Sequence, residues 1–234
     1  WFVDVKAASE GDGSVLKPFN NLEQATQAVI VQGDTIFVKN GNYTLNEKID
    51  LSDGISLIGE SKEGVVITTT ADLGIRLYTS GVSNAGQLLS TFTFKTKNMQ
   101  CGKGIELQHR DYVVFDNIHF EGFKYSALTA FSKYTQEDPG VDNYLYGLQV
   151  RNCSFKDCSH SGKSSYSGAL QLGQAYGALV YGNKIDGWRD DHGYGIKFGG
   201  GGWVANCKIF DNTISLTPHT ITGGWGAPFS IEFF

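Results

Sequence analysis

The sequence predicts an all-β solenoid, in which short coils of chain stack on one another. Glycine is abundant, with 30 residues that interrupt many short runs of Val, Ile, Phe and Tyr, while charged residues make up only 18%. Such a composition favours strands over helices. Short segments of one pattern also recur along the second half of the chain, and a constant unit with variable loops is typical of solenoids.

The first predicted element is a helix over residues 20–30, NNLEQATQAVI, which is the one convincing amphipathic helical pattern in the chain. Asn20 or Asn21 would be its N-cap. Strand-rich segments follow at 34–46 and 55–69. Because the open end of a solenoid exposes a sheet edge, we expect this helix to cover the first coil.

Five later segments share a strand pattern in which apolar residues alternate with outward positions. They are GIEL (104–107), ALTA (127–130), ALQL (169–172), GIKF (195–198) and SIEF (230–233). When they are stacked, they predict two apolar columns inside the solenoid. The first column is Ile105, Leu128, Leu170, Ile196 and Ile231, and the second is Leu107, Ala130, Leu172, Phe198 and Phe233.

Four second segments align in the same way, which predicts a two-strand unit for each coil. They are FDNIHF (115–120), VRNCSF (150–155), VYGNKI (180–185) and IFDNTI (209–214). They add two more columns, Phe115, Val150, Val180 and Ile209, and Phe120, Phe155, Ile185 and Ile214. Asn183 and Asn212 also align, and stacked asparagines can satisfy each other's amides in a buried position.

The N-terminal segment FVDVKAASEGDGSVLKPFNNLEQATQAV, followed by GDTIFVKNGNYTL, GISLIGE and the repeats at 104–233, resembles the right-handed parallel β-helix of the pectate-lyase-like superfamily. The resemblance implies one parallel β-helix domain over residues 1–234, secreted or on the cell surface. The superfamily includes lyases, hydrolases, epimerases, phage tailspikes and surface proteins, so a fold is implied and not one activity. Since the last segment ends on a strand without a cap, we expect further coils, a second domain or a partner chain beyond Phe234.

Composition and charge exclude several function classes. The formal charge of −5 opposes general nucleic-acid binding, which requires a basic face. No apolar run reaches the length of a membrane span. The four cysteines, Cys101, Cys153, Cys158 and Cys207, have spacings that match no metal motif. We therefore expect buried free thiols, or else one or two disulfide bridges.

The first strand of each coil also carries one outward side chain, and these side chains predict a polar strip along one sheet. The strip is Glu106, Thr129, Gln171, Lys197 and Glu232, and stacked positions lie about 4.7–4.9 Å apart. Enzymes of the superfamily hold substrate along such a strip between long loops, which the insertions 131–146 and 157–167 would supply. The alternative is a solvated sheet face on which Lys197 and Glu232 form a surface ion pair.

The densest group of reactive side-chain types lies in GWRDDHGYGIKFGGGGW, residues 187–203, which leads into and out of the Lys197 strand. β-Elimination from a polyuronate needs a cation for the carboxylate, a base for the α-proton and an acid for the leaving oxygen. Lys197 or Arg189 would supply the cation, Lys197 or His192 the base, and Tyr194 or His192 the acid. The alternative is a turn in which an aspartate caps backbone amides.

Other residues complete the predicted site. Asp190, Asp191 and Glu232 would hold Ca²⁺ through carboxylate oxygens, and no other cofactor is expected. Flat aromatic side chains bury the apolar faces of sugar rings. The remaining groove residues would be Trp188, Trp225 and His219, the last of these in the loop before Glu232.

The sequence thus predicts a secreted or cell-surface protein that binds an acidic polysaccharide and cleaves it by β-elimination. A glycoside hydrolase on the same fold is a second hypothesis, in which Glu232 pairs with Asp190 or Asp191 as the two carboxyls. The third is a non-catalytic adhesin or glycan-binding module. Unsaturated sugar ends, reducing sugar alone, or neither product would distinguish the three.

Overall fold

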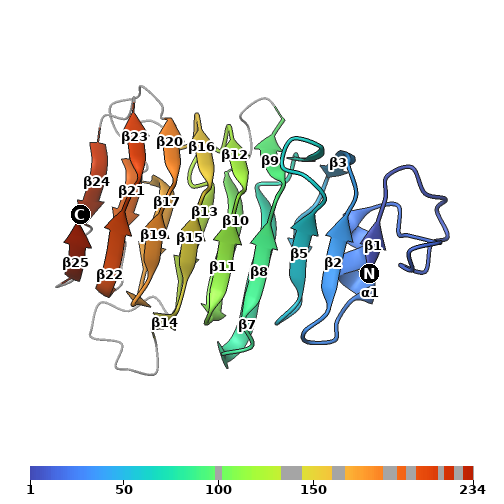
Figure 1. Cartoon of the computed structure of the whole chain (residues 1–234), viewed down its shortest axis with the longest axis horizontal. Coiled ribbons are helices and arrows are strands. Elements are labelled where there is room, and N and C mark those ends of the chain that lie inside the picture. The colour runs from blue at the N-terminus through green and yellow to red at the C-terminus, as the bar shows by residue number, and fades with distance from the viewer. Residues whose placement is uncertain are drawn as a thin grey trace.

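A computed structural model describes residues 1–97, 102–132, 144–159, 167–186, 194–198, 204–215, 219–223 and 229–233. The chain forms a parallel β-helix. Three sheets, each made of parallel strands, extend along the molecule, and the coils follow one another from the N-terminal to the C-terminal end (Figure 1). The predicted all-β parallel β-helix is confirmed.

Each coil contributes one strand to each of three sheets. Sheet A contains β1 (Phe2–Val3), β2 (Thr35–Val38), β5 (Ser56–Gly59), β8 (Gln87–Ser90), β11 (Val113–Asp116), β15 (Gln149–Arg151), β19 (Leu179–Tyr181), β22 (Val204–Phe210) and β25 (Phe229–Phe233), with the short β14 (Leu145–Tyr146) and β18 (Ala175–Tyr176) beside them. Sheet B contains β3 (Gly41–Leu45), β6 (Val65–Thr69), β9 (Thr93–Thr96), β12 (His119–Glu121), β16 (Ser154–Lys156), β20 (Lys184–Asp186) and β23 (Thr213–Ser215). Sheet C contains β4 (Ile49–Asp50), β7 (Leu73–Ser83), β10 (Lys103–Arg110), β13 (Leu128–Phe131), β17 (Gly168–Gly173), β21 (Tyr194–Phe198) and β24 (His219–Gly223).

The predicted two-strand unit is therefore wrong, because each second segment contains a corner between sheets A and B. The corner is made by one residue with a left-handed backbone, at Asn117, Asn152, Gly182 and Asp211 in successive coils, with φ between 53° and 65°. Asn, Asp and Gly adopt this conformation most readily. The corner changes the phase of the alternation, so Phe115 and Phe120 are both fully buried although a continuous strand would point them to opposite faces.

The four predicted core columns are confirmed across four successive coils, from β10, β11 and β12 to β21, β22 and β23. Ile105, Leu128, Leu170 and Ile196 pair in register through sheet C, and the columns that begin at Leu107, Phe115 and Phe120 pair in the same way. The rings of Phe120 and Phe155 stack with their centroids 5.0 Å apart.

The prediction that Ile231 and Phe233 are the fifth members of the first two columns is wrong. The strand that follows β21 in sheet C is β24, which places Ile221 beside Ile196, whereas β25 pairs with β22 in sheet A. Both HTITG and SIEF can form a strand, and only the path of the chain around the coil decides which of them continues sheet C.

Two asparagines make the predicted buried stack just after the sheet A–sheet B corner. Asn183 is 2% exposed. Its Oδ1 accepts the backbone N–H of Cys153, and its Nδ2 donates to the backbone oxygen of Val150 and to Oδ1 of Asn212, each at 2.9 Å. The stack therefore links three successive coils through amide groups that would otherwise be buried without partners.

The helix α1 (Leu22–Ala28) begins two residues later than predicted and ends two residues earlier. Asn21, and not Asn20, is the N-cap: its Oδ1 accepts the backbone N–H of Gln24 at 2.7 Å. Leu22 and Ala25 are buried, and the helix packs against β1, β3 and β4 at the N-terminal end of the β-helix. No helix in the described part of the chain is long and apolar enough to cross a membrane.

Three of the four cysteines, Cys153, Cys158 and Cys207, are buried free thiols, which agrees with the first of the two expectations for them. Burial raises the pKa of Cys153 and of Cys158 to about 12, so both stay protonated at neutral pH. Cys101 lies outside the described residues.

Asn183→Ala tests the asparagine stack. The variant leaves the N–H of Cys153 buried without its partner and removes one hydrogen bond from the C=O of Val150; an unpaired buried donor costs about 1–3 kcal/mol. We expect the free energy of unfolding, measured by urea denaturation, to fall by at least that amount. Asn42, which is exposed on β3, is the control: its change to alanine should cost no more than about 0.5 kcal/mol. Equal stability of the two variants would contradict the role of the stack.

Asn21→Ala tests the helix cap. Loss of an N-cap side chain costs typically about 1 kcal/mol, so the midpoint of thermal unfolding should fall. Asn20→Ala is the matched control, because Asn20 accepts only the side-chain amide of Asn21 at 2.7 Å. A larger loss with Asn20→Ala than with Asn21→Ala would overturn the assignment of the cap.

Candidate functional site

The candidate site is an outward strip of six side chains on sheet C. Glu106, Thr129, Gln171 and Lys197 pair in register on successive strands, as predicted. The strip continues toward the N-terminus through Arg76 and Asp50, which the repeat alignment missed. GIRL at 74–77 has the same pattern as GIEL and GIKF, so the sequence contained the signal for Arg76. At about 4.8 Å for each step, the six positions span roughly 24 Å.

The N-terminal half of the strip holds two carboxylates that are paired with basic side chains. The Nε of Arg76 lies 2.5 Å from Oδ1 of Asp50, and the Nζ of Lys48 lies 3.1 Å from Oδ2. Burial alone would raise the pKa of Asp50, but the hydrogen bonds from Arg76 and Lys48 outweigh it and lower this pKa. Glu106 is engaged in a similar way, because the Nζ of Lys103 lies 2.6 Å from its Oε2.

The middle of the strip is neutral and polar. Gln171 accepts a hydrogen bond from the hydroxyl of Ser126 at 3.4 Å. Thr129 is only 4% exposed, although we expected it on an open face, and its buried hydroxyl has no hydrogen-bond partner among the described residues. A buried polar group of this kind costs free energy unless water or a ligand satisfies it.

Lys197 is the basic member at the C-terminal side of the strip. Its side chain is half-buried, and this burial lowers its pKa from the ordinary value of 10.5, because burial disfavours the charged form. The Nζ lies 5.9 Å from the centroid of the Tyr194 ring. The strand before it approaches closely: a Cβ on Gly168 would lie 2.8 Å from the Cβ of Lys197, so only glycine fits there.

Two predicted site residues lie elsewhere than expected. Glu232 is on β25 and pairs in register with Lys208 of sheet A, so it is not the strip neighbour of Lys197. The strip position beside Lys197 is occupied by Thr222 of β24. His219, expected in a loop, begins β24 and pairs with Tyr194. The predicted Lys197–Glu232 surface pair is therefore wrong.

Several predicted residues lie outside the part of the chain that the structure describes. They are Trp188, Arg189, Asp190, Asp191, His192 and Trp225. Within the described ranges, no group of three His, Cys, Asp or Glu side chains is placed to hold a metal ion.

Connection length distinguishes the surroundings of sheet C from the rest of the molecule. Residues 133–143 follow β13, residues 160–166 precede β17, and 187–193 and 199–203 stand on either side of β21. The corners between sheets A and B have only two residues, as at 117–118. The longer connections in the sequence therefore adjoin strands β13, β17 and β21 of sheet C.

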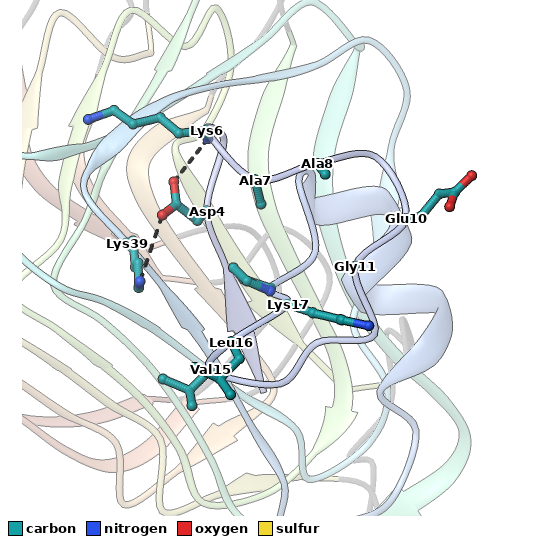
Figure 2. Close-up of a pocket in the computed structure, with 11 residues that line it drawn as sticks. Asp4, Lys6, Ala7, Ala8, Glu10, Gly11, Val15, Leu16, Lys17 and Lys39 are labelled. Carbon is teal, nitrogen blue, oxygen red and sulfur yellow. Dashed lines mark hydrogen bonds and ion pairs between the residues drawn. The ribbon is translucent and has the colours of Figure 1, made fainter.

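Two surface hollows are defined by the described residues, and neither contains a strip residue. One, of about 510 Å³, lies at the N-terminal end, where Asp4 accepts the backbone N–H of Lys6 at 2.9 Å and its Oδ2 lies 3.7 Å from the Nζ of Lys39 (Figure 2). The exposed apolar side chains of Val15 and Leu16 border it. The other, of about 580 Å³, lies on sheet B.

No protein-family model matches the chain, and no curated protein matches it. Solved structures do share its fold. A pectin methylesterase variant in complex with a hexasaccharide is 14% identical, with a TM-score of 0.50, over 95% of this chain and 80% of that chain. A second pectin methylesterase complex gives 13% and 0.50 over the same shares. A rhamnogalacturonan lyase is 16% identical, with a TM-score of 0.48, over 100% of this chain and 62% of that one. At these identities the likeness shows the parallel β-helix fold alone.

Proposed function

We propose that the protein binds an acidic polysaccharide along the sheet C strip and cleaves it by β-elimination, with Lys197 as the base. The observation that carries the proposal is the setting of Lys197: it is half-buried, with a lowered pKa, and lies in register with Gln171, Thr129 and Glu106. The fold is suited to an extended glycan, since solved parallel β-helix structures include a pectin methylesterase that holds a hexasaccharide. A substrate of this class implies a secreted or cell-surface protein.

The proposed reaction assigns one role to each group near β21. The neutral amine of Lys197 takes the α-proton of the uronate, the electron pair of that C–H bond forms the new double bond, and the glycosidic C–O bond breaks. Tyr194 is the proposed acid that protonates the leaving oxygen, with His192 as the other candidate. Arg189 is proposed to neutralise the uronate carboxylate.

The remaining strip residues have binding roles in this proposal. The amide of Gln171 and the hydroxyl of Thr129 would hydrogen-bond sugar hydroxyls, and Trp188, Trp225 and His219 would line the groove. Asp190 and Asp191 are proposed to hold Ca²⁺, whose charge would polarise the uronate carboxylate.

Chelation with EDTA should then abolish turnover, and added Ca²⁺ should restore it.

Lys197→Met and Lys197→Arg test the assignment of the base. Incubation with a panel of polyuronates should raise the absorbance near 230–240 nm, because each cleavage leaves an unsaturated sugar end. Loss of a general base typically costs about 10²–10⁴-fold in rate, so Lys197→Met should lose at least 10²-fold. Lys197→Arg keeps the charge but cannot give up its proton, so it should be equally inactive if Lys197 is the base and active if Lys197 only neutralises charge.

Lys208→Met is the matched control, because Lys208 is an exposed lysine on sheet A. It should keep full activity. Full activity of folded Lys197→Met protein would refute the site. Reducing sugar without absorbance would indicate a hydrolase, methanol from methyl-esterified pectin without absorbance an esterase, and binding without product a non-catalytic module; each of these would refute β-elimination.

The pH dependence follows from the direction of the Lys197 pKa shift. Burial disfavours the ammonium form, so the base form of Lys197 should appear at a lower pH than for a free lysine. We expect kcat/KM to rise with pH, with a midpoint below 10.5, the ordinary lysine value. If kcat/KM does not change with pH up to 10.5, or falls as Lys197 loses its proton, the role of Lys197 as base is contradicted.

A further inference from the structure

Sheet B carries a group of three side chains that the proposed function does not use. Ser154 on β16 pairs in register with His119 on β12, and Glu121 follows two positions later on the same face of β12. The Nδ1 of His119 lies 2.7 Å from the hydroxyl oxygen of Ser154. The Nε2 of the same ring lies 3.8 Å from Oε2 of Glu121. The imidazole of His119 thus lies between a hydroxyl group and a carboxylate.

The charges around His119 favour the imidazole tautomer in which Nδ1, the nitrogen next to Ser154, can act as a base. The carboxylate of Glu121 favours the proton on Nε2, which leaves Nδ1 to accept the O–H of Ser154. Burial lowers the pKa of His119 below 6.5; Glu121 raises this pKa, and Lys156 and Lys62 lower it again. The imidazole is therefore neutral at neutral pH. Glu121 in turn accepts a hydrogen bond from Lys156 at 3.0 Å, which keeps it an anion.

The same face offers room and charge for a substrate. The hollow of about 580 Å³ on sheet B reaches Glu121. Its lining is rich in hydroxyl and amine groups, from Thr44, Thr68, Thr70, Thr96, Lys95 and Lys97. Beyond Ser154, Lys184 is its register partner on the next strand. A hydroxyl-rich ligand such as a sugar fits this lining, and the ammonium of Lys184 would stabilise an oxyanion that forms at Ser154.

We propose that Ser154, His119 and Glu121 form a second site, which cleaves acyl esters carried by a hydroxyl-rich ligand. The hydroxyl oxygen of Ser154 attacks the ester carbonyl while its proton passes to Nδ1 of His119. The bond to the alcohol oxygen then breaks, and the alcohol leaves with that proton. Water, deprotonated by His119, releases the acid and restores the serine. Glu121 is a positioning residue, since it acts through the ring of His119.

This inference does not depend on the proposed β-elimination, because it concerns another sheet and its test needs no polyuronate. The full chain is incubated with a fluorophosphonate probe, which reacts with activated serines, and the modified residue is mapped by mass spectrometry. We expect a single adduct, on Ser154. The protein should also hydrolyse 4-nitrophenyl acetate, and Ser154→Ala should abolish both the adduct and the hydrolysis.

His119→Gln should slow the labelling of Ser154 by about 10²-fold or more, as expected for loss of a general base. In the wild-type protein the labelling rate should fall below neutral pH with a midpoint under 6.5, as His119 takes up a proton. Ser215, which donates to Asp186 on the same sheet at 3.4 Å, is the matched control serine. Wild-type labelling of Ser154 no faster than that of Ser215, or unchanged labelling in folded His119→Gln protein, would overturn the proposal.

Discussion

The structure depends on the parallel, in-register pairing of successive coils. Hydrogen bonds between coils fix the neighbours of each strand about 4.8 Å away, so a side chain always faces the equivalent side chain of the coils before and after it. Apolar positions therefore merge into continuous columns, as from Ile105 to Ile196. Polar positions obey the same rule, and Asn183 is tolerated in the interior because Asn212 stands at the equivalent place.

Stacking also imposes a rule on charge, because like charges at equivalent positions would repel. The outward rows follow this rule: Asp50 faces Arg76, Asp116 faces Arg151, and Glu121 faces Lys156. Exposed pairs of this kind contribute little to stability, so their main effect is to keep the coils in register without repulsion. In the row of Lys197 the neighbour on the preceding coil is the neutral Gln171, which also avoids repulsion between like charges.

Coil geometry also separates the two faces that carry reactive groups. The corner between sheets A and B is two residues long and is fixed by a left-handed residue such as Asn117 or Asn152. Longer connections adjoin the sheet C strands β13, β17 and β21. Sheet B has the shorter row of His119 and Ser154, and a polar hollow on the same sheet reaches Glu121. The two proposed sites are therefore separate, because side chains on different sheets point in different directions.

The sequence by itself determined the fold class, the core columns apart from Ile231 and Phe233, the presence of the N-terminal helix and the alignment of Glu106, Thr129, Gln171 and Lys197. These features are local or periodic, so alternation and repetition reveal them. It did not determine that a coil has three strands, because one left-handed residue is enough to turn the chain. Only the tertiary structure decided that β24 and not β25 continues sheet C, which removed Glu232 from the strip. It also brought Ser154 to His119, 35 positions apart in the sequence. The physical reason is that contacts between coils depend on the length of each connection, which the pattern of a single strand does not contain.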